Sequence, residues 1–233
     1  MAVAFRASAV PGGNPTTSFT VIIPASTLTD DVLFLSVTNG GSTADPTVTD
    51  DDTGGNAWAK VNAGLHNGSL WWKRATSGTA SKTVTVSGLT NSSAGVLKVF
   101  SGALLTGNSF SNVSTEDNAS ADETHAGFTP LEADEMICAA IANTDNLSVT
   151  SLACTNPGTL SQVEKLSTGG LDSASAFGHA LQIGGPTATG NFTWAQTDRA
   201  NTSITWGIRQ EPPPPPGVGA ASTALQPAVV RSP

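Results

Sequence analysis

The sequence predicts an all-β protein: a jelly-roll-like antiparallel β-sandwich with two pseudo-repeated halves and a Pro-rich C-terminal tail. Three runs, Leu70–Arg74, Thr83–Val86 and Gly95–Phe100, favour an extended chain through β-branched, aromatic or alternating apolar residues. Segments rich in Ser, Gly, Thr and Asn separate these runs, as in turns between antiparallel strands. Only 12% of the residues are charged, whereas the surfaces of helices need Glu, Lys, Arg and Gln.

Further strand-like runs occupy the rest of the chain. Val32–Val37 is a nearly continuous apolar run, which is typical of a strand buried on both faces. A polar loop is expected from Asp45 to Asn56, before the Trp-containing runs. The runs that we assign to strands, in order, are Ala2–Arg6, Ser18–Ile23, Val32–Val37, Ala57–Val61, Leu70–Arg74, Thr83–Val86, Gly95–Phe100, Met136–Ile141, Asn191–Trp194 and Ser203–Ile208.

The second part of the chain repeats the order of the first. Met136–Ile141 follows a proline and an acidic pair, as Val32–Val37 does, and the last two runs keep the spacing of their counterparts. We therefore expect residues 1–210 to hold two related halves, about 1–108 and 123–210, joined near Ser109 to Asp122. The halves would form two domains or interleave as two sheets of one sandwich. We prefer the second arrangement, because each half has barely enough large apolar residues to cover one sheet.

Charge and hydropathy exclude several classes of protein. The formal net charge of −8 opposes nucleic-acid binding, which depends on clusters of Lys and Arg. No apolar run approaches the length that spans a bilayer, so we expect no membrane insertion. Residues Met1 to Arg6 lack the basic start and sustained apolar core of a signal peptide, so we expect synthesis in the cytoplasm without a Sec signal.

The residues that carry catalysis or bind cofactors are few and scattered. Cys138 and Cys154 are expected to be buried thiols in a reducing compartment, with a disulfide as the alternative. His66, His125 and His179 lie far apart in the sequence, and two cysteines at these spacings do not make a zinc site. No nucleophile elbow, phosphate-binding loop or zinc-protease motif is present. We expect no enzyme activity and no cofactor.

The most acidic stretch is Asp50-Asp51-Asp52-Thr53-Gly54-Gly55-Asn56. Carboxylate oxygens in a Gly-containing loop are ligands that calcium prefers, which makes Asp50 and Asp52 candidates for a metal site. The spacing matches no EF-hand loop, because the distal glutamate is missing. A solvated turn between strands is the interpretation that we favour.

The tryptophans Trp58, Trp71 and Trp72 offer a second candidate site, an aromatic platform for sugar rings. Trp71 and Trp72 must point to opposite faces of one strand, so at least one of them is expected in the core. The other would cover a sheet edge, contact a subunit or stack on a glycan.

Residues 211–233 form a separate segment. The five prolines Pro212, Pro213, Pro214, Pro215 and Pro216 favour a stiff polyproline II spacer of about 15 Å. After them, Val218, Leu225 and Val229 are too sparse to fold alone. The segment is either a linker or an arm that docks on another subunit.

Four stretches carry a resemblance to a known class of protein: Met1–Arg6, the step from Pro24 to Asp31-Val32-Leu33, Asp52–Trp58 with its Gly-Asn-x-Trp turn, and Leu70–Lys73. Residues 1 to 210 resemble β-sandwich proteins of bacteriophages and prophages, of the minor tail, fibre or capsid decoration type. The resemblance implies a non-enzymatic virion component that assembles with other virion subunits. We expect a homo-oligomer, and adhesion to a host surface glycan is compatible with this role. It supplies no catalytic residue. The alternative is a carbohydrate-binding β-sandwich module, which would normally carry a signal peptide.

Overall fold

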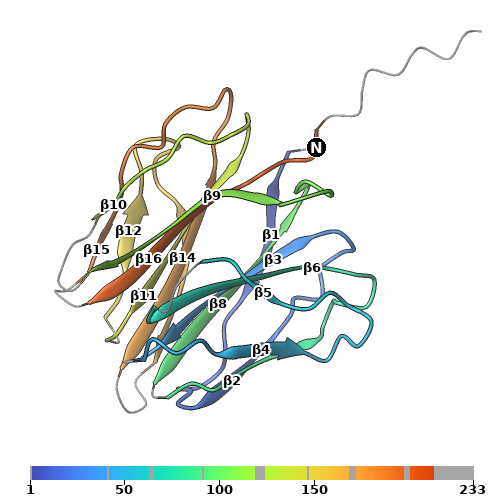
Figure 1. Ribbon diagram of the computed structural model, residues 1–233, viewed down its shortest axis with the longest axis vertical. Coiled ribbons are helices and arrows are strands. Elements are labelled where there is room, and N and C mark those ends of the chain that lie inside the picture. Colours follow the sequence, from blue (N-terminus) through green and yellow to red (C-terminus); the bar gives the residue numbers. More distant parts are fainter. Residues whose placement is uncertain are drawn as a thin grey trace, which may run out of the picture.

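The computed structural model describes residues 2–40, 42–62, 66–90, 92–118, 124–145, 147–167, 172–196 and 200–212. Within these ranges the chain forms sixteen strands and no helix, so the predicted all-β sandwich class is confirmed (Figure 1). None of the described segments forms a helix long and apolar enough to cross a membrane. Of the five prolines in the tail, Pro212 is described, and the expected arm from Pro213 onward, with Val218, Leu225 and Val229, lies outside the described residues.

The strands divide into a first half, β1 to β8, and a second half, β9 to β16. The first half contains β1 (Ala4–Ala9), β2 (Ser18–Ile22), β3 (Val32–Asn39), β4 (Thr47–Asp50), β5 (Ala59–Lys60), β6 (Gly68–Arg74), β7 (Thr83–Ser87) and β8 (Ser93–Ser101). The second contains β9 (Phe110–Asn118), β10 (Thr124–His125), β11 (Met136–Asn143), β12 (Thr150–Ala153), β13 (Ser161–Ser167), β14 (Ser173–Leu181), β15 (Phe192–Ala195) and β16 (Asn201–Ile208).

Each half has one large and one small sheet. The first half has a five-stranded sheet, β1-β8-β3-β6-β5, and a three-stranded sheet, β2-β7-β4. The second half has a five-stranded sheet, β9-β16-β11-β14-β13, and a three-stranded sheet, β10-β15-β12. Adding eight to each strand number of the first half gives the strand order of the second. Every sheet takes its strands from one half. The preferred arrangement, in which the halves interleave as the two sheets of one sandwich, is therefore wrong, and each half forms a sandwich of its own.

The apolar residues form three cores that alternate with the sheets. One core lies between the two sheets of the first half and includes Leu33, Leu35 and Val84. A second lies between the two sheets of the second half and includes Ile137 and Phe192. The third, here called the shared core, lies between the two large sheets and joins the halves; its largest members are Phe34, Phe100, Phe177 and Trp206. The order of layers is therefore small, large, large, small.

The central position of the large sheets explains the two continuous apolar runs. In β3, Leu33 and Leu35 point into the core of the first half, while Val32 and Phe34 point into the shared core. Residues 136–141 of β11 divide in the same way between the shared core and the core of the second half. Successive side chains of a strand point to opposite faces, so a strand between two cores shows a continuous apolar run instead of alternation.

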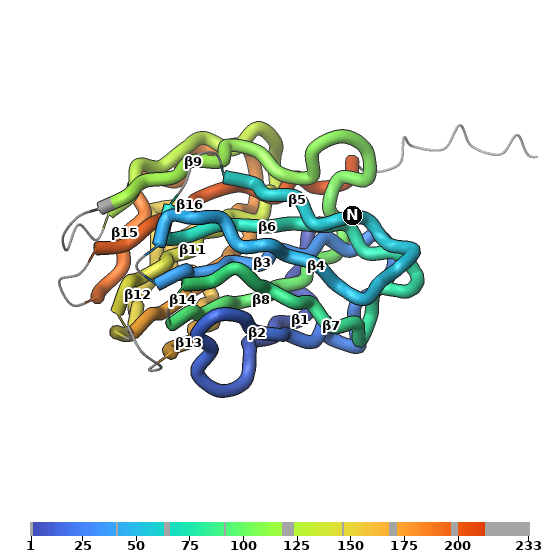
Figure 2. Tube along the Cα trace, turned by 60° about the horizontal axis from the view of Figure 1, so that its bottom comes forward, coloured from blue at the N-terminus to red at the C-terminus, as the bar shows by residue number. Residues whose placement is uncertain are grey.

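Small residues let the two large sheets approach closely. The Oγ atoms of Ser36 and Ser175 lie 3.0 Å apart in the interior, and Thr38 Oγ1 donates to the carbonyl oxygen of Ala174 at 2.8 Å. Gly68 has no room for a side chain, because a Cβ atom there would lie 2.5 Å from the Cβ of Ala142. Outside this interface the loop between β1 and β2 lies beside β13, where Lys165 Nζ donates to Gly13 O at 2.6 Å (Figure 2).

Two strands lie where the sequence indicated only polar connections. β4 falls within the expected loop from Asp45 to Asn56, and β9 occupies most of the expected junction from Ser109 to Asp122. Both are edge strands, each with a single partner strand in its sheet. An edge strand can keep polar side chains in solvent, so its sequence resembles that of a loop.

Candidate functional site

Strand β6 carries a candidate site on each of its faces. Trp71 packs against the core of the first half, whereas Trp72 packs against the shared core. Both rings are half-buried, and each packs against one of the two cores. Lys73 is on the same face as Trp71, and its side chain reaches Asp50 at the end of β4 in the small sheet. The two faces therefore present a charged cluster and an aromatic surface.

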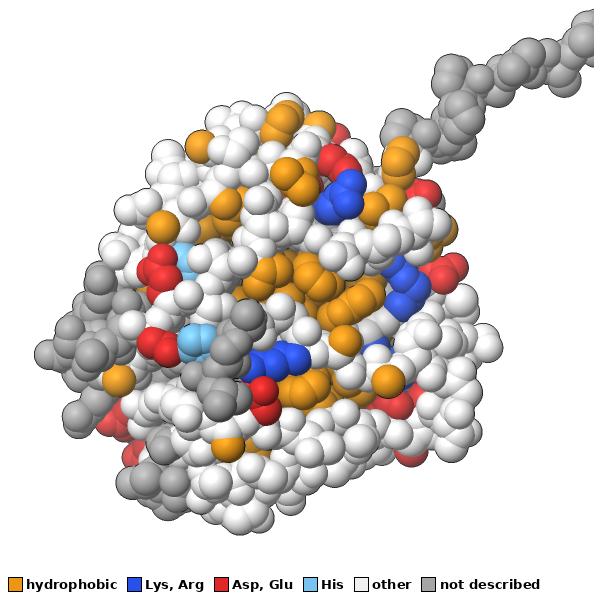
Figure 3. Space-filling view, in the orientation of Figure 1, with side chains coloured by type: hydrophobic (Ala, Val, Ile, Leu, Met, Phe, Trp, Pro, Cys, Tyr) orange, Lys and Arg blue, Asp and Glu red, His pale blue; other side chains and the backbone are white. Residues whose placement is uncertain are grey.

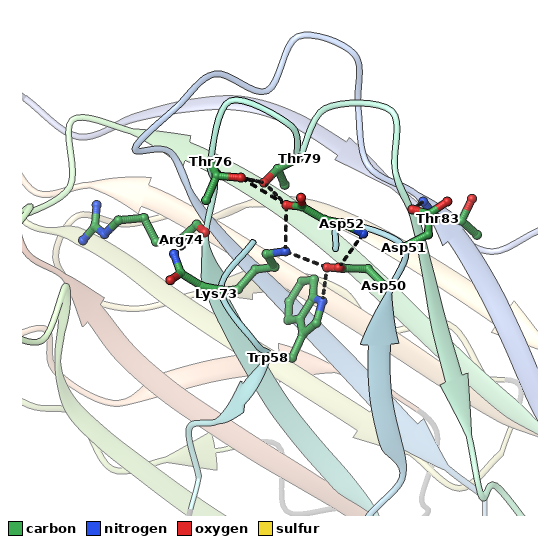
Figure 4. Close-up of polar contacts among 10 residues, drawn as sticks. Asp50, Asp51, Asp52, Trp58, Lys73, Arg74, Thr76, Thr79 and Thr83 are labelled. Atoms are coloured by element: carbon green, nitrogen blue, oxygen red, sulfur yellow. Dashed lines mark hydrogen bonds and ion pairs between the residues drawn. The ribbon is translucent and has the colours of Figure 1, made fainter. Parts of the chain in front are cut away.

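The charged cluster has a buried lysine at its centre (Figure 4). The side chain of Lys73 is 0% exposed, and its Nζ lies 2.7 Å from Asp50 Oδ2 and 3.4 Å from Asp52 Oδ2. The indole Nε1 of Trp58 donates to Asp50 Oδ2 at 2.7 Å, and the Asp52 backbone N–H donates to Asp50 Oδ1 at 3.1 Å. Both carboxylate oxygens of Asp50 thus accept hydrogen bonds from fixed donors.

The second carboxylate of the cluster is held by hydroxyl groups. Thr79 Oγ1 donates to Asp52 Oδ2 at 2.6 Å and Thr76 Oγ1 donates to it at 3.2 Å. The hydrogen bond from Thr79 and the nearby ammonium of Lys73 outweigh burial and hold the pKa of Asp52 below its usual value. Gly55 is required here, because a Cβ atom at this position would lie 2.1 Å from Asp52 Oδ2.

The acidic stretch is a turn in which Asp51, Thr53, Gly54 and Asn56 are exposed, as expected, but two of its carboxyl groups are buried. The side chains of Asp50 and Asp52 are only 6% and 5% exposed, because the ammonium of Lys73 draws them inward. Asp51 turns the other way and accepts a hydrogen bond from the backbone N–H of Thr83. Among the described residues, no three His, Cys, Asp or Glu side chains gather as metal ligands would.

The aromatic surface on the other face of β6 lies where the two halves meet. The rings of Trp72 and Phe110 make an edge-to-face contact with centroids 5.3 Å apart, and both rings pack against the shared core, as do Val61 and Val113. A hollow of about 320 Å³ is lined by Trp72 with Asn56, Ala57, Lys73 and Arg74. Figure 3 shows apolar side chains in the middle of this face, with basic side chains nearby. The ring of Trp71, on the opposite face, is held by a hydrogen bond within its own strand: its Nε1 donates to Ser69 Oγ at 2.9 Å.

The three histidines lie in separate places. His66 Nδ1 and Asp117 Oδ2 lie 2.5 Å apart, at hydrogen-bond distance. His125 is buried, with its Nδ1 2.8 Å from Ser203 Oγ, and burial lowers its pKa. His179 lies between the halves, beside Lys98. The structure thus brings no two of them together.

Lys98 and His179 form a buried basic pair that lay outside the predicted site residues. Lys98 Nζ lies 2.8 Å from His179 Nδ1 and donates to Ser161 O at 2.9 Å. Burial lowers the pKa of Lys98 to about 8, and burial together with the neighbouring Lys98 lowers the pKa of His179 to about 4. A lysine inside the apolar run Gly95–Phe100 was the sequence signal for this pair.

The two cysteines are separate buried thiols, as expected. Cys138 lies in the shared core and Cys154 in the core of the second half, and both are free. Burial raises the pKa of both thiols, so they remain protonated and unreactive at neutral pH.

Comparisons with known proteins found no matching family model, no matching curated protein and no matching solved structure.

Proposed function

We propose that this chain is a non-enzymatic structural component of a phage virion, of the minor tail, fibre or capsid decoration type. The observation that carries the proposal is the order of strands, repeated in both halves and packed back to back through the shared core. A rigid body of this kind offers surfaces for assembly. The cluster around Lys73 holds its groups by mutual hydrogen bonds, which suits a structural role better than turnover of a substrate.

We infer further that each half is a jelly roll. Along the first half, β1 to β4 alternate between the large and the small sheet, and β6 to β8 continue the alternation. Such alternation is what two Greek keys folded into a sandwich produce, and jelly rolls are common in viral capsid proteins and in lectins. The fold therefore supports both the virion role and the carbohydrate-binding alternative, and analogy of fold alone does not choose between them.

We place the tail's role in attachment to neighbouring subunits. Glu211 is the last residue with described bonds: its N–H donates to Gly102 O at 3.0 Å, and its Oε2 accepts from the N–H of Leu105 at 2.7 Å. The body of the protein therefore extends to Glu211, one residue beyond the sequence boundary at 210. Truncation after Pro212 removes the arm without touching these bonds.

Density-gradient purification of phage particles tests this proposal. We expect the full-length chain to sediment with intact particles. We expect the chain truncated after Pro212 to keep its melting temperature and to lose most of its incorporation, because the arm supplies contacts with the neighbouring subunit. Recovery of the full-length chain only as free protein would contradict the virion role. If both chains were incorporated equally into the particles, the tail would be only a spacer and not an attachment arm.

The carbohydrate-binding alternative has one observation in its favour, the hollow beside Trp72. A partly exposed indole beside Asn56 and Arg74 is a surface on which a sugar ring can stack. A glycan array separates the two functions: binding that is lost in Trp72→Ala and kept in the matched control Trp71→Ala would favour the carbohydrate-binding module. Sugar binding by intact particles as well would show a virion component that adheres to the host.

A further inference from the structure

The buried cluster around Lys73 combines a nucleophile, an electrophile and a proton carrier. The side chain of Lys73 is 0% exposed, and its Nζ lies 2.7 Å from Asp50 Oδ2, so the amine is held in hydrogen-bond contact with the carboxyl group that it would attack. Asp52, 3.4 Å from the same nitrogen, is a second carboxylate in a site that holds one cation. An ion pair needs only one of these two acids, so the second one calls for an explanation.

We propose that Lys73 and Asp50 condense to an intramolecular isopeptide bond, with Asp52 as the group that carries the protons. The bond would join Nζ of Lys73 to Cγ of Asp50. It would link β6 in the large sheet of the first half to the end of β4 in the small sheet, and so fasten the two sheets of this sandwich covalently.

The atoms and protons of this condensation balance. Asp52 takes one proton from the Lys73 ammonium and passes it to an oxygen of Asp50. The free amine then attacks Cγ, and the C–N bond forms. Asp52 then takes a second proton from the nitrogen and passes it to the hydroxyl group on Cγ. The C–O bond to that hydroxyl group breaks, and one water is released. One proton stays on the amide nitrogen, Asp52 is again ionised, and no oxidant or cofactor takes part.

The remaining contacts fit the intermediate of this reaction. Attack on Cγ places negative charge on the oxygens of Asp50, and each of these oxygens already accepts a hydrogen bond, from Trp58 Nε1 at 2.7 Å and from the Asp52 backbone at 3.1 Å. Donors fixed in advance on a developing oxyanion are the main means by which proteins stabilise such an intermediate. Thr76 and Thr79 hold Asp52 as a carboxylate, the form that accepts a proton.

Burial supplies the driving force that the reaction lacks in water. Groups held in reactive contact behave as if at very high concentration, on the order of 10⁵ M or more. The carboxyl groups are 6% and 5% exposed, so little water competes with the amine. The ring of Trp58 covers the site, with Lys73 Nζ 6.0 Å from its centroid.

Intact-mass spectrometry of the purified full-length protein tests the proposal directly. Loss of one water makes the expected mass 18 Da lower than that of the sequence. We expect the deficit to be absent in Lys73→Arg, which keeps the charge, and in Asp50→Ala. In Asp52→Asn the deficit should appear slowly or incompletely, since the proton carrier is lost. The matched control Lys82→Arg should retain the full deficit.

Sequencing of chymotryptic peptides by tandem mass spectrometry locates the lost water. A pair of peptides joined through Lys73 and Asp50 is the expected product. A wild-type protein with the full mass of its sequence would overturn the proposal and leave a buried ion pair. A deficit of 18 Da at any other position, such as a cyclised aspartate, would overturn it as well. The wild-type measurement decides the question even if a variant fails to fold.

Discussion

Replacement of Trp206 by alanine is expected to destabilise the whole protein by about 3–5 kcal/mol, the usual cost of emptying a large aromatic site in a core. Trp206 is fully buried in the shared core. Its ring packs on Phe177 of its own half at 5.0 Å and on Phe34 of the other half at 5.5 Å. The cavity would therefore open between the halves, where two rigid sheets cannot collapse to fill it. Thermal unfolding should show a melting temperature lower by about 10 °C.

Trp206→Phe is the matched control. The indole Nε1 of Trp206 is buried and donates to no atom of the described residues, so its removal costs no hydrogen bond. Phenylalanine keeps an aromatic ring against Phe34 and Phe177 and leaves a smaller cavity than alanine, so we expect Trp206→Phe to cost clearly less than Trp206→Ala. A loss below about 1 kcal/mol for Trp206→Ala would show that the large sheets do not share a tightly packed core.

Lys98 should make stability depend on alkaline pH. Its pKa is lowered from 10.5 to about 8 in the folded protein, so between these values the unfolded chain binds more protons than the folded chain. The contribution of Lys98 to the free energy of unfolding therefore rises with pH from about 8 to 10.5, by about 3 kcal/mol. Cys138 and Cys154 oppose this rise, since their raised pKa values keep them protonated in the folded state alone.

A comparison of Lys98→Met with the wild type isolates this contribution. We expect the variant to be more stable at pH 7, because it buries no charge, and this advantage should shrink as the pH rises from 8 to 10. Urea unfolding at each pH measures the free energy of unfolding of the variant and of the wild type. The cysteines contribute alike to both proteins, so their effect cancels in the difference. Lys82→Met, at a partly exposed site, is the control that should show no such trend. If the free energy of unfolding of Lys98→Met exceeded that of the wild type by the same amount from pH 7 to 10, the lowered pKa of Lys98 would be contradicted.

His179 should make the stability of the protein depend on pH in the acid range. Its folded pKa is lowered to about 4, whereas the unfolded imidazole titrates near 6.5, so the unfolded chain takes up the proton first as the pH falls. Stability is therefore expected to decline from pH 6.5 to 4, through the same linkage. Burial lowers the pKa of His125 too, so both histidines contribute to this decline.

The sequence predicted those features of the fold that a single strand determines. The continuous apolar run Val32–Val37 indicated burial on both faces, and β3 does lie between two cores. Where pairing and layers depend on contacts between distant residues, the pattern failed. β14 went unassigned because its small residues, such as Ser175, lack the apolar alternation of a strand, and their smallness is explained only by the large sheet of the other half.

For the candidate site, too, the sequence indicated the local features but not the contacts between distant residues. It singled out the acidic stretch at Asp50 and the paired tryptophans as candidate site residues, and both belong to the site. What the aspartates bind was not visible, because Lys73 lies 23 residues beyond Asp50 and belongs to the other sheet. A lysine within a strand of aromatic residues was the available signal, since such a side chain needs a buried counter-ion.

Differential scanning calorimetry of the full-length protein tests most directly whether the two halves form one body through the shared core. We expect a single transition whose calorimetric enthalpy equals the van't Hoff enthalpy, because unfolding of one half would expose Phe34, Phe100 and Trp206 to water. Two separate transitions, or a van't Hoff enthalpy about half the calorimetric value, would contradict this, because either result would show halves that unfold independently.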